Sequence, residues 1–189
     1  MNEQQLITAL QLGDETAFAL LVEQYQQMVF NTVLGLVQQT QDAEDIAQEV
    51  FIQVHQSVRN FKGESKLSTW LYRICITKSL DWKKHQQRNK RFAVITNLFG
   101  NNSKYINELP GFDHPGVQLA RKENAALLFK ALNQIPENQR VAFVLQKLEG
   151  LGQAEIAAVM QLSEGAVESL LQRARKNLKK MLEHYYQNS

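Results

Sequence analysis

The chain has 189 residues, of which 44% are hydrophobic and 21% are charged, and its formal net charge is +2. This composition excludes a wholly disordered chain, while the lack of a long apolar run or a basic, apolar leader excludes a membrane span and a standard secretory signal. The single cysteine excludes an internal disulfide and the four scattered histidines lack metal-site spacing, so we expect a cytoplasmic protein without metal or cofactor.

The small net charge hides a strong asymmetry along the chain. Residues 1–60 contain one basic residue, Arg59, and eight acidic ones, whereas residues 61–92 contain nine basic residues and two acidic ones. A surface built from the first segment repels phosphates and suits a basic protein partner, and a surface built from the second attracts phosphates. The sequence therefore predicts a protein-binding face beside a nucleic-acid-binding face.

Helical spacing dominates the first part of the chain. Apolar residues recur with this spacing from Phe18 to Val33, from Ala43 to Val58 and from Leu67 to Cys75. Either Thr40 or Asp42 is expected to cap the second of these helices. Cys75 lies on the apolar stripe of the third and is expected to be a small buried hydrophobe. Helices joined by such short loops can share one core, which predicts a three- or four-helix bundle over residues 1–91.

The helical pattern breaks between residues 92 and 118, where turn-forming glycines and two of the three prolines are found, and we expect a linker there. From residue 119 the helical spacing returns. Pro136 is expected in the first turn of a helix, and Ser163 is expected to cap the last one. The predicted fold class is all-α: two small helical domains, residues 1–91 and 119–189, joined by a linker.

Residues 151–182 have the layout of a helix-turn-helix, with a short helix, a tight turn through Ser163 and a longer helix. In this motif the first turns of the second helix enter the DNA major groove. Arg173 could contact guanine or phosphate, Gln172 could read adenine, and Glu168 could accept a hydrogen bond from cytosine N4. An ordinary helical hairpin with a solvated charged face is the alternative.

The basic segment interleaves cations with aromatic side chains, including Trp70 and Trp82. This mixture suits single-stranded DNA, because bases stack on rings while the backbone follows the charge. The small polar residues of loop 61–66 could hold one extruded base. Alternatively the tryptophans belong to the core and the lysines are merely solvated, and for Trp70 the core is favoured.

The predicted second helix carries an acidic face, away from its apolar stripe. Such faces are often only solvated, but the near absence of basic residues up to position 60 favours a basic protein partner. No nucleophile–base pair or Gly-rich phosphate loop stands out, so we do not expect an enzyme.

Three segments, in this order, resemble the extracytoplasmic-function (ECF) class of bacterial RNA polymerase sigma factors. They are the stretch from Asp42 to Phe51, the loop Phe61–Ser65 with the helix from Ser68 to Ile74, and residues 132–175. The resemblance covers most of the chain. It implies a non-enzymatic factor that binds core polymerase and directs it to promoters with a −10 and a −35 element.

The resemblance also implies roles for individual residues. The segment that docks on the coiled coil of the largest polymerase subunit corresponds to Asp42, Asp45, Gln48, Glu49 and Gln53. The −10 contacts correspond to Phe61, Lys62, Gly63, Glu64, Ser65, Lys66, Tyr72, Arg73, Thr77, Lys83, Lys84 and Arg88. The −35 contacts correspond to Gly165, Glu168, Ser169, Gln172, Arg173, Arg175 and Lys176. The implied partners are core polymerase, including its flap for the C-terminal domain, promoter DNA and an anti-sigma factor, with the chain itself a monomer.

Two positions depart from the family pattern, because basic residues are common where Glu168 and Leu170 stand. Leu170 also extends the apolar face of its helix, so the usual −35 contacts do not transfer directly. The linker adds a geometric expectation. As a free coil its residues span roughly 30 Å, whereas elements some twenty base pairs apart are separated by about 70 Å. We therefore expect the free protein to be more compact than the promoter complex.

Two other functions stay open. A DNA-binding regulator that does not engage polymerase explains residues 151–182 but leaves the acidic and basic helices without a role. A protein-interaction adaptor needs no DNA contact at all. Polymerase pull-down with Asp45→Lys or Glu49→Lys, and salt-dependent binding to single-stranded DNA with Lys83→Glu and Lys84→Glu, separate these alternatives.

Overall fold

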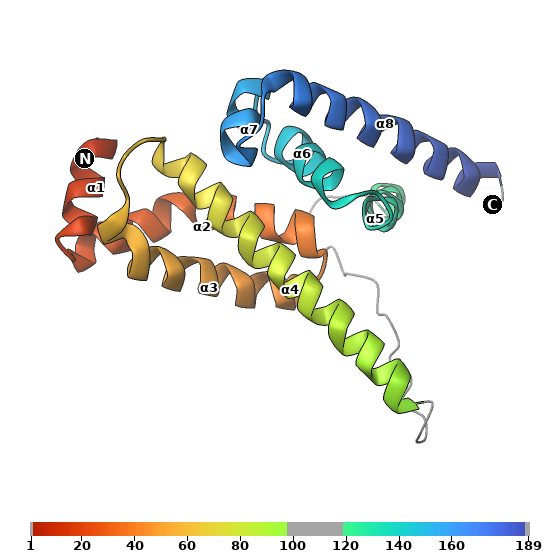
Figure 1. The fold of residues 1–189 in the computed structure, drawn as a ribbon, viewed down its shortest axis with the longest axis horizontal. Helices are drawn as coiled ribbons and strands as arrows, with labels where there is room; N and C mark the ends of the chain where they lie inside the picture. Colours follow the sequence, from red (N-terminus) through yellow and green to blue (C-terminus); the bar gives the residue numbers. More distant parts are fainter. Residues whose placement is uncertain (1, 98–118, 188–189) are drawn as a thin grey trace.

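The computed structural model describes residues 2–97 and 119–187, and these residues form two helical modules packed side by side (Figure 1). The N-terminal module consists of α1 (Glu3–Gln11), α2 (Glu15–Val37), α3 (Thr40–Ser57), the 3-10 helix η1 (Val58–Asn60) and α4 (Leu67–Asn97). The C-terminal module consists of α5 (Leu119–Leu132), α6 (Glu137–Lys147), α7 (Gln153–Met160) and α8 (Glu164–Gln187). The described part of the chain contains no strand, which confirms the predicted all-α class. None of its helices is long and apolar enough to cross a membrane.

The core of the N-terminal module lies where α2, α3 and α4 meet. Leu21, Val50 and Leu71 come from these three helices and are fully buried in it. Cys75 is also fully buried, as expected, and burial raises the pKa of its thiol. The cysteine therefore acts as a core side chain rather than a reactive one.

Helix α1 is the fourth helix of the predicted three- or four-helix bundle, and the sequence analysis gave no bounds for it. Asn2 caps it, because the Asn2 side chain accepts a hydrogen bond of 2.8 Å from the backbone N–H of Gln5. The Gln5 side-chain oxygen in turn accepts a hydrogen bond of 3.0 Å from the Asn2 backbone N–H, which completes a capping box. Leu6 and Leu10 bury one face of α1 in the core, so the module has four long helices.

Several expected helix ends differ in detail. Neither Thr40 nor Asp42 caps α3, because Gln39 occupies that position without a side-chain bond and Asp42 lies in the first turn. Pro136 precedes α6 as its cap, with extended backbone, rather than occupying the first turn. Ser163 does cap α8, since its hydroxyl accepts a bond of 3.3 Å from the Ala166 N–H.

Helix α4 continues to Asn97, past the expected start of the linker at residue 92. The rest of the expected linker, residues 98–118, lies outside the described residues. Side chains are described for residues 2–89 and 126–183.

The C-terminal module packs its long helix α8 across α5, α6 and α7. Val167 and Leu171 at the start of α8 join the cluster with α6 and α7, and Ala174 and Leu178 join the cluster with α5. Leu170 also packs against the first of these clusters, as its apolar character suggested. The turn between α7 and α8 passes through Gln161 in the left-handed conformation, with φ of 56°, which reverses the chain within three residues.

Candidate nucleic-acid and protein interfaces

The outer face of α3 is acidic and open to solvent. Asp45, Gln48 and Glu49 are exposed on it, while Asp42 and Gln53 are half-buried. Burial, and then the neighbouring Asp45, raise the pKa of the Asp42 carboxyl. The five residues therefore share one helix surface, which carries carboxylates and amides.

Two further features of this face were missing from the sequence analysis. Ile52 is 56% exposed although it is a large apolar side chain, and it lies one turn from Gln48 and Glu49. Ile52 thus adds apolar surface to a face that otherwise carries carboxylates and amides. Glu49 also forms an ion pair of 3.4 Å with Lys78 on α4, which fixes this acidic surface beside the basic helix.

The loop between η1 and α4 places only part of its sequence at the surface. Lys62, Gly63 and Glu64 are exposed, and Gly63 has a φ of 69°, which suits glycine at the tip of the loop. Phe61 differs from the expectation, because its ring is buried and tilts against Trp70 with centroids 4.8 Å apart. Phe61 supports the loop from the core and is not open to an extruded base here.

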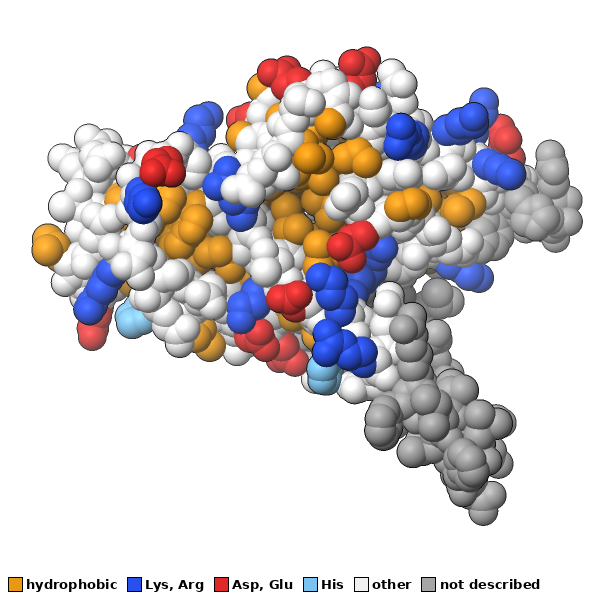
Figure 2. Space-filling model, viewed as in Figure 1, with side chains coloured by type: hydrophobic (Ala, Val, Ile, Leu, Met, Phe, Trp, Pro, Cys, Tyr) orange, Lys and Arg blue, Asp and Glu red, His pale blue; other side chains and the backbone are white. Residues whose placement is uncertain are grey.

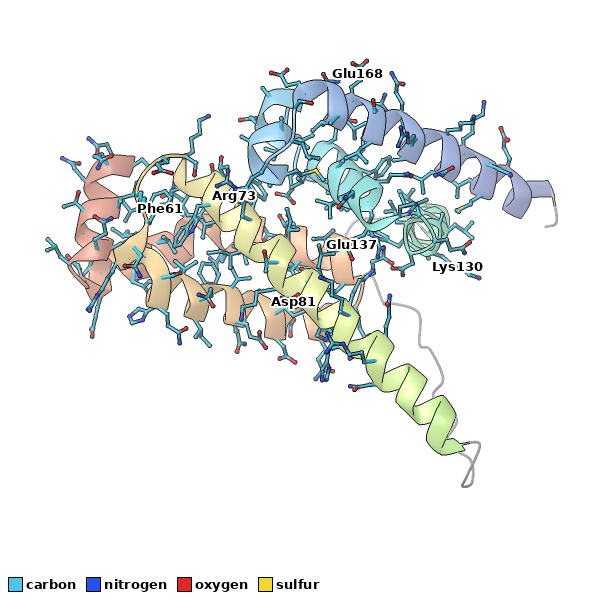
Figure 3. The ribbon with its side chains drawn as sticks, in the orientation of Figure 1. Phe61, Arg73, Asp81, Lys130, Glu137 and Glu168 are labelled. Atoms are coloured by element: carbon cyan, nitrogen blue, oxygen red, sulfur yellow. The ribbon has the colours of Figure 1, made fainter. Side chains whose placement is uncertain are left out.

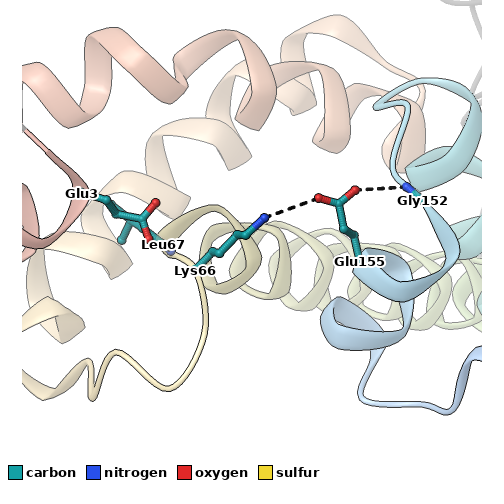
Figure 4. Close-up of polar contacts among 5 residues, drawn as sticks. All are labelled: Glu3, Lys66, Leu67, Gly152 and Glu155. Carbon is teal, nitrogen blue, oxygen red and sulfur yellow. Dashed lines mark hydrogen bonds and ion pairs between the residues drawn. The ribbon is translucent and has the colours of Figure 1, made fainter.

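Side chains of α1 form hydrogen bonds to both ends of this loop. The Gln11 side chain donates a hydrogen bond of 2.8 Å to the Phe61 carbonyl, at the start of the loop. At its end, a Glu3 carboxylate oxygen accepts a bond of 3.2 Å from the Leu67 N–H at the first residue of α4 (Figure 4). Helix α1 thereby fixes both ends of the loop, and Glu3 satisfies a free N–H at the start of α4.

The basic residues of α4 fall into two groups. Lys84 and Arg88 are exposed, as is the hydroxyl residue Thr77 on the same helix, and Lys84 forms an ion pair of 3.6 Å with Asp81 one turn away. Arg73 and Lys83 are half-buried because they point to the C-terminal module. Figure 3 shows Arg73 between α4 and α7, with Glu168 far from it on the outer side of α8.

The helix-turn-helix presents its expected reading residues to solvent. Gly165, Glu168, Ser169, Gln172, Arg173, Arg175 and Lys176 are all exposed on α8. Gln172 donates a bond of 3.3 Å to Glu168, and Arg175 donates one of 2.7 Å to Gln146 on α6. Figure 2 shows acidic side chains at the start of α8 and basic ones farther along it, so the two ends of the helix carry different charges.

An apolar seam joins the two modules. Leu36 and Tyr72 of the N-terminal module are buried in one cluster with Val144, Leu145 and Ile156 of the C-terminal module. The Arg73 guanidinium donates a bond of 2.7 Å to the Ala158 carbonyl of α7. The two modules therefore pack directly against each other, and the expectation that the free protein is more compact than the promoter complex stays a prediction.

Polar contacts flank the seam. Lys66 forms a long ion pair of 3.8 Å with Glu155, whose other oxygen accepts a bond of 3.1 Å from the Gly152 N–H (Figure 4). Tyr72 donates a bond of 3.1 Å to Glu149. Burial raises the pKa of the Glu149 carboxyl, against the effect of the Tyr72 hydrogen bond.

A second cluster of polar side chains lies at the other end of the seam. Lys83 donates a bond of 2.7 Å to the Asn133 side-chain oxygen, which also accepts one of 3.3 Å from Arg140. The Asn133 amide in turn contacts the buried Gln38 at the end of α2. Burial, together with the nearby Arg140 cation, lowers the pKa of Lys83 to about 7.

Two family models match the chain, and they match in the order of the two modules. "Sigma-70 region 2" covers residues 21–89 and "Sigma-70, region 4" covers residues 125–178. The chain is 34% identical to the RNA polymerase sigma-H factor of Pseudomonas aeruginosa, over 96% of this chain and 94% of that protein. It is 32% identical to the ECF RNA polymerase sigma-E factor of Escherichia coli, over 93% and 92% respectively.

The chain belongs to the ECF family of RNA polymerase sigma factors. Its function is promoter-directed transcription initiation. Among solved structures, the sigma factor RpoE of Bartonella quintana, in complex with the anti-sigma factor NepR, has the same fold with a TM-score of 0.60 at 22% identity, over 88% of this chain and 96% of that one.

The ECF sigma factor contains functional residues that the sequence analysis missed, because their roles depend on distant neighbours. Glu3 and Gln11 bond to the two ends of a loop that lies 64 and 50 positions away, respectively. Asn133 and Glu149 hold side chains of the other module. The capping box at Asn2 was a readable signal for α1, but no local pattern marked the seam.

Proposed function

We propose that this ECF sigma factor binds core RNA polymerase through the acidic face of α3. Asp45, Gln48 and Glu49 supply exposed polar contacts, and Ile52 supplies an apolar anchor among them. The family match over residues 21–89, with this acidic surface on it, is the observation that carries the proposal. The implied contact of the C-terminal module with the polymerase flap is part of the same proposal.

In the open complex, the loop 61–66 and the exposed face of α4 hold the melted −10 strand. Lys62, Lys66, Lys84 and Arg88 are exposed cations that follow the phosphates, and Thr77 adds a hydroxyl beside them. The glycine at the loop tip leaves open space, since a Cβ on Gly63 would meet no neighbour within 4 Å. A base extruded from the strand has room there.

The start of α8 reads the −35 element in the major groove. Glu168 and Gln172 supply base-specific groups, while Arg173 and Lys176 supply charge. The acidic start of the helix gives this factor a preference for cytosine, because the N4 amino group donates to a carboxylate. Phosphate contacts along the basic second half offset the repulsion that Glu168 brings.

The partners of this factor follow from its class. Bartonella RpoE was solved with an anti-sigma factor, and we extend that type of partner to this chain. The factor acts in the cytoplasm as a monomer that joins core polymerase, and it needs no cofactor or metal for this role. It is a binding protein and not an enzyme.

Selection of promoter fragments by the reconstituted holoenzyme tests this function. Core polymerase is incubated with the purified chain and a library of genomic fragments, and the fragments retained in heparin-resistant complexes are sequenced. The proposal predicts two enriched blocks at a fixed spacing. Enrichment by the chain alone, with no gain from polymerase, would instead support the DNA-binding regulator.

A further inference from the structure

Helix α1 connects the two ends of the loop 61–66. Glu3, in the first turn of α1, accepts the hydrogen bond from the Leu67 N–H where the loop ends, and Gln11, its last residue, donates to the Phe61 carbonyl where the loop starts. The two side chains are eight positions apart, so the helix bridges about 12 Å between them. Among the described residues, these are the side-chain hydrogen bonds from another element to the backbone of the loop and of its junction with α4.

Helix α1 is itself anchored to the core of its module. The capping box of Asn2 and Gln5 fixes the residue at which the helix starts, directly before Glu3. Leu6 and Leu10 lie in the same buried cluster as Phe61, and α1 packs on η1. A helix anchored in this way holds both ends of the loop in fixed positions, because neither side chain moves independently of the core.

The tip of the loop is open to solvent. Lys62, Gly63 and Glu64 are exposed, and a Cβ on Gly63 would meet no neighbour within 4 Å. Ordering a flexible segment when it binds a ligand costs conformational entropy, and a segment that is already ordered avoids most of that loss. The two hydrogen bonds from α1 therefore favour capture of a ligand at the tip, although they lie at the ends of the loop.

We propose that Glu3 and Gln11 are positioning residues, which hold the loop 61–66 in the conformation that captures a base extruded from the −10 strand. They act through the backbone at the two ends of the loop and make no contact with DNA in this role. The inference rests on the proposed function for the role of the loop. It gives α1 a function of its own, although the match to the region 2 model starts at residue 21, after this helix.

Substitutions at the two positions remove the hydrogen bonds one at a time. Gln11→Met removes the donor and keeps the length and the helix propensity of the side chain. Glu3→Ala removes the acceptor, whereas Glu3→Gln keeps a side-chain oxygen that accepts a hydrogen bond and should restore the parent behaviour. Gln4→Met and Glu15→Ala are the matched controls, at exposed positions of α1 and α2 whose side chains form no described hydrogen bond to the loop.

NMR relaxation of the backbone amides in the full-length chain measures how well the loop is ordered. The order parameter of the Gly63 amide should be about 0.85 in the parent and in the two controls, and below about 0.6 in Gln11→Met and Glu3→Ala. Circular dichroism and the affinity for core polymerase should stay at the parent values, and a variant that fails this check leaves the other position to decide. A Gly63 amide as mobile in the parent as in the variants would overturn the proposal.

An abasic scan of the −10 strand measures base capture by the holoenzyme. A promoter fragment selected by the holoenzyme is made with an unpaired −10 region, and one nucleotide of that region at a time is replaced by an abasic one. The parent should lose affinity at the position whose base enters the loop. If the ordered loop conformation falls to about one tenth in a variant, affinity for the intact strand falls about tenfold, while affinity for the strand without this base is unchanged.

The outcomes of this scan separate the inference from the function on which it rests. Smaller abasic discrimination in Gln11→Met and Glu3→Ala, restored in Glu3→Gln, supports the positioning role. Parent-like discrimination in Gln11→Met and Glu3→Ala, or equal losses for intact and abasic strands, would show that α1 only stabilises the fold and would overturn the inference alone. A parent that loses affinity at no abasic position would reject base capture by the loop, and the positioning role with it.

Discussion

The Tyr72 hydroxyl donates a hydrogen bond of 3.1 Å to a carboxylate oxygen of Glu149, and the two residues belong to different modules. Tyr72 lies on α4, in the segment that resembles the −10-binding helix, and Glu149 follows α6. Burial raises the pKa of the Tyr72 hydroxyl, which therefore stays a donor at neutral pH. One bond thus ties a proposed DNA-contact residue to the other half of the molecule.

Tyr72→Phe should weaken this closed arrangement, in which the two modules pack against each other. The ring keeps its apolar contacts, but Glu149 loses its donor, and a hydrogen bond to a charged group contributes about 1.5 to 3 kcal/mol. The ratio of open to closed chains should rise by roughly tenfold or more, and energy transfer between dyes on Gln56→Cys and Lys180→Cys would measure it. Tyr25→Phe, at a half-buried tyrosine on α2, is the control. An unchanged or smaller open fraction in Tyr72→Phe would show that the bond does not hold the modules.

The closed fraction should also depend on pH through Lys83. Its pKa falls from 10.5 to about 7 on burial against Asn133, with the Arg140 cation adding to the effect and Glu137 opposing it. The closed form therefore disfavours the charged amine, and closure releases a proton between these two values. Closure becomes more favourable as pH rises from 7 to 9 and is weakest below 7.

Energy transfer between the two dyes, measured at pH 7 and pH 9, tests the direction of this pH dependence. The Lys83→Met variant should lose the dependence of the closed fraction on pH. Titration of Glu149 does not change the closed fraction between pH 7 and 9, because its raised pKa favours closure only at acidic pH. Tyr72 would oppose closure only at high pH, because its phenolate is disfavoured in the seam. A closed fraction that falls between pH 7 and 9 would contradict the assignment to Lys83.

Asp45→Lys should reduce the affinity for core polymerase by about tenfold or more, since it reverses a charge at the centre of the acidic face. Glu23→Lys makes the same change on the exposed side of α2, outside that face, and should have a small effect. Gel filtration or surface binding with purified core polymerase measures both. Equal losses in the two variants would indicate a general charge effect rather than a docking surface.

Glu168→Ala should relax the preference for one base of the −35 element. A well-placed contact to a base edge contributes about 1 to 3 kcal/mol of discrimination, so a cytosine preferred by the parent should lose most of its advantage. Promoter selection with parent and variant holoenzymes measures this, with Lys180→Ala as the control for a change of charge. If selected promoters keep the same base at every −35 position, Glu168 does not read sequence.

The sequence predicted most helices and their main surfaces because these depend on local patterns. The stripe from Phe18 to Val33, the acidic face of α3 and the cap at Ser163 need only neighbours within a turn or two. The family resemblance implied a DNA contact for Phe61, yet its ring packs against Trp70, and this packing is set by the fold of the core.

The contacts between the two modules could not be predicted from such local patterns. Tyr72 and Glu149 are separated by 77 positions, and Glu3 and Leu67 by 64. Nothing in the sequence marks Gly35, because only the approach of Val144 and Leu148 shows that a larger side chain does not fit there. Contacts of this type depend on tertiary packing and leave no periodic trace in one sequence.

Run-off transcription with purified core polymerase is the most direct test of the central claim that this chain directs initiation. A template carrying a fragment selected by the holoenzyme is transcribed with and without the chain, in the absence of any inhibitor. The account predicts one transcript of defined start that requires the chain and weakens in Asp45→Lys. If adding the chain at any concentration gives the same products as core polymerase alone, the central claim is contradicted.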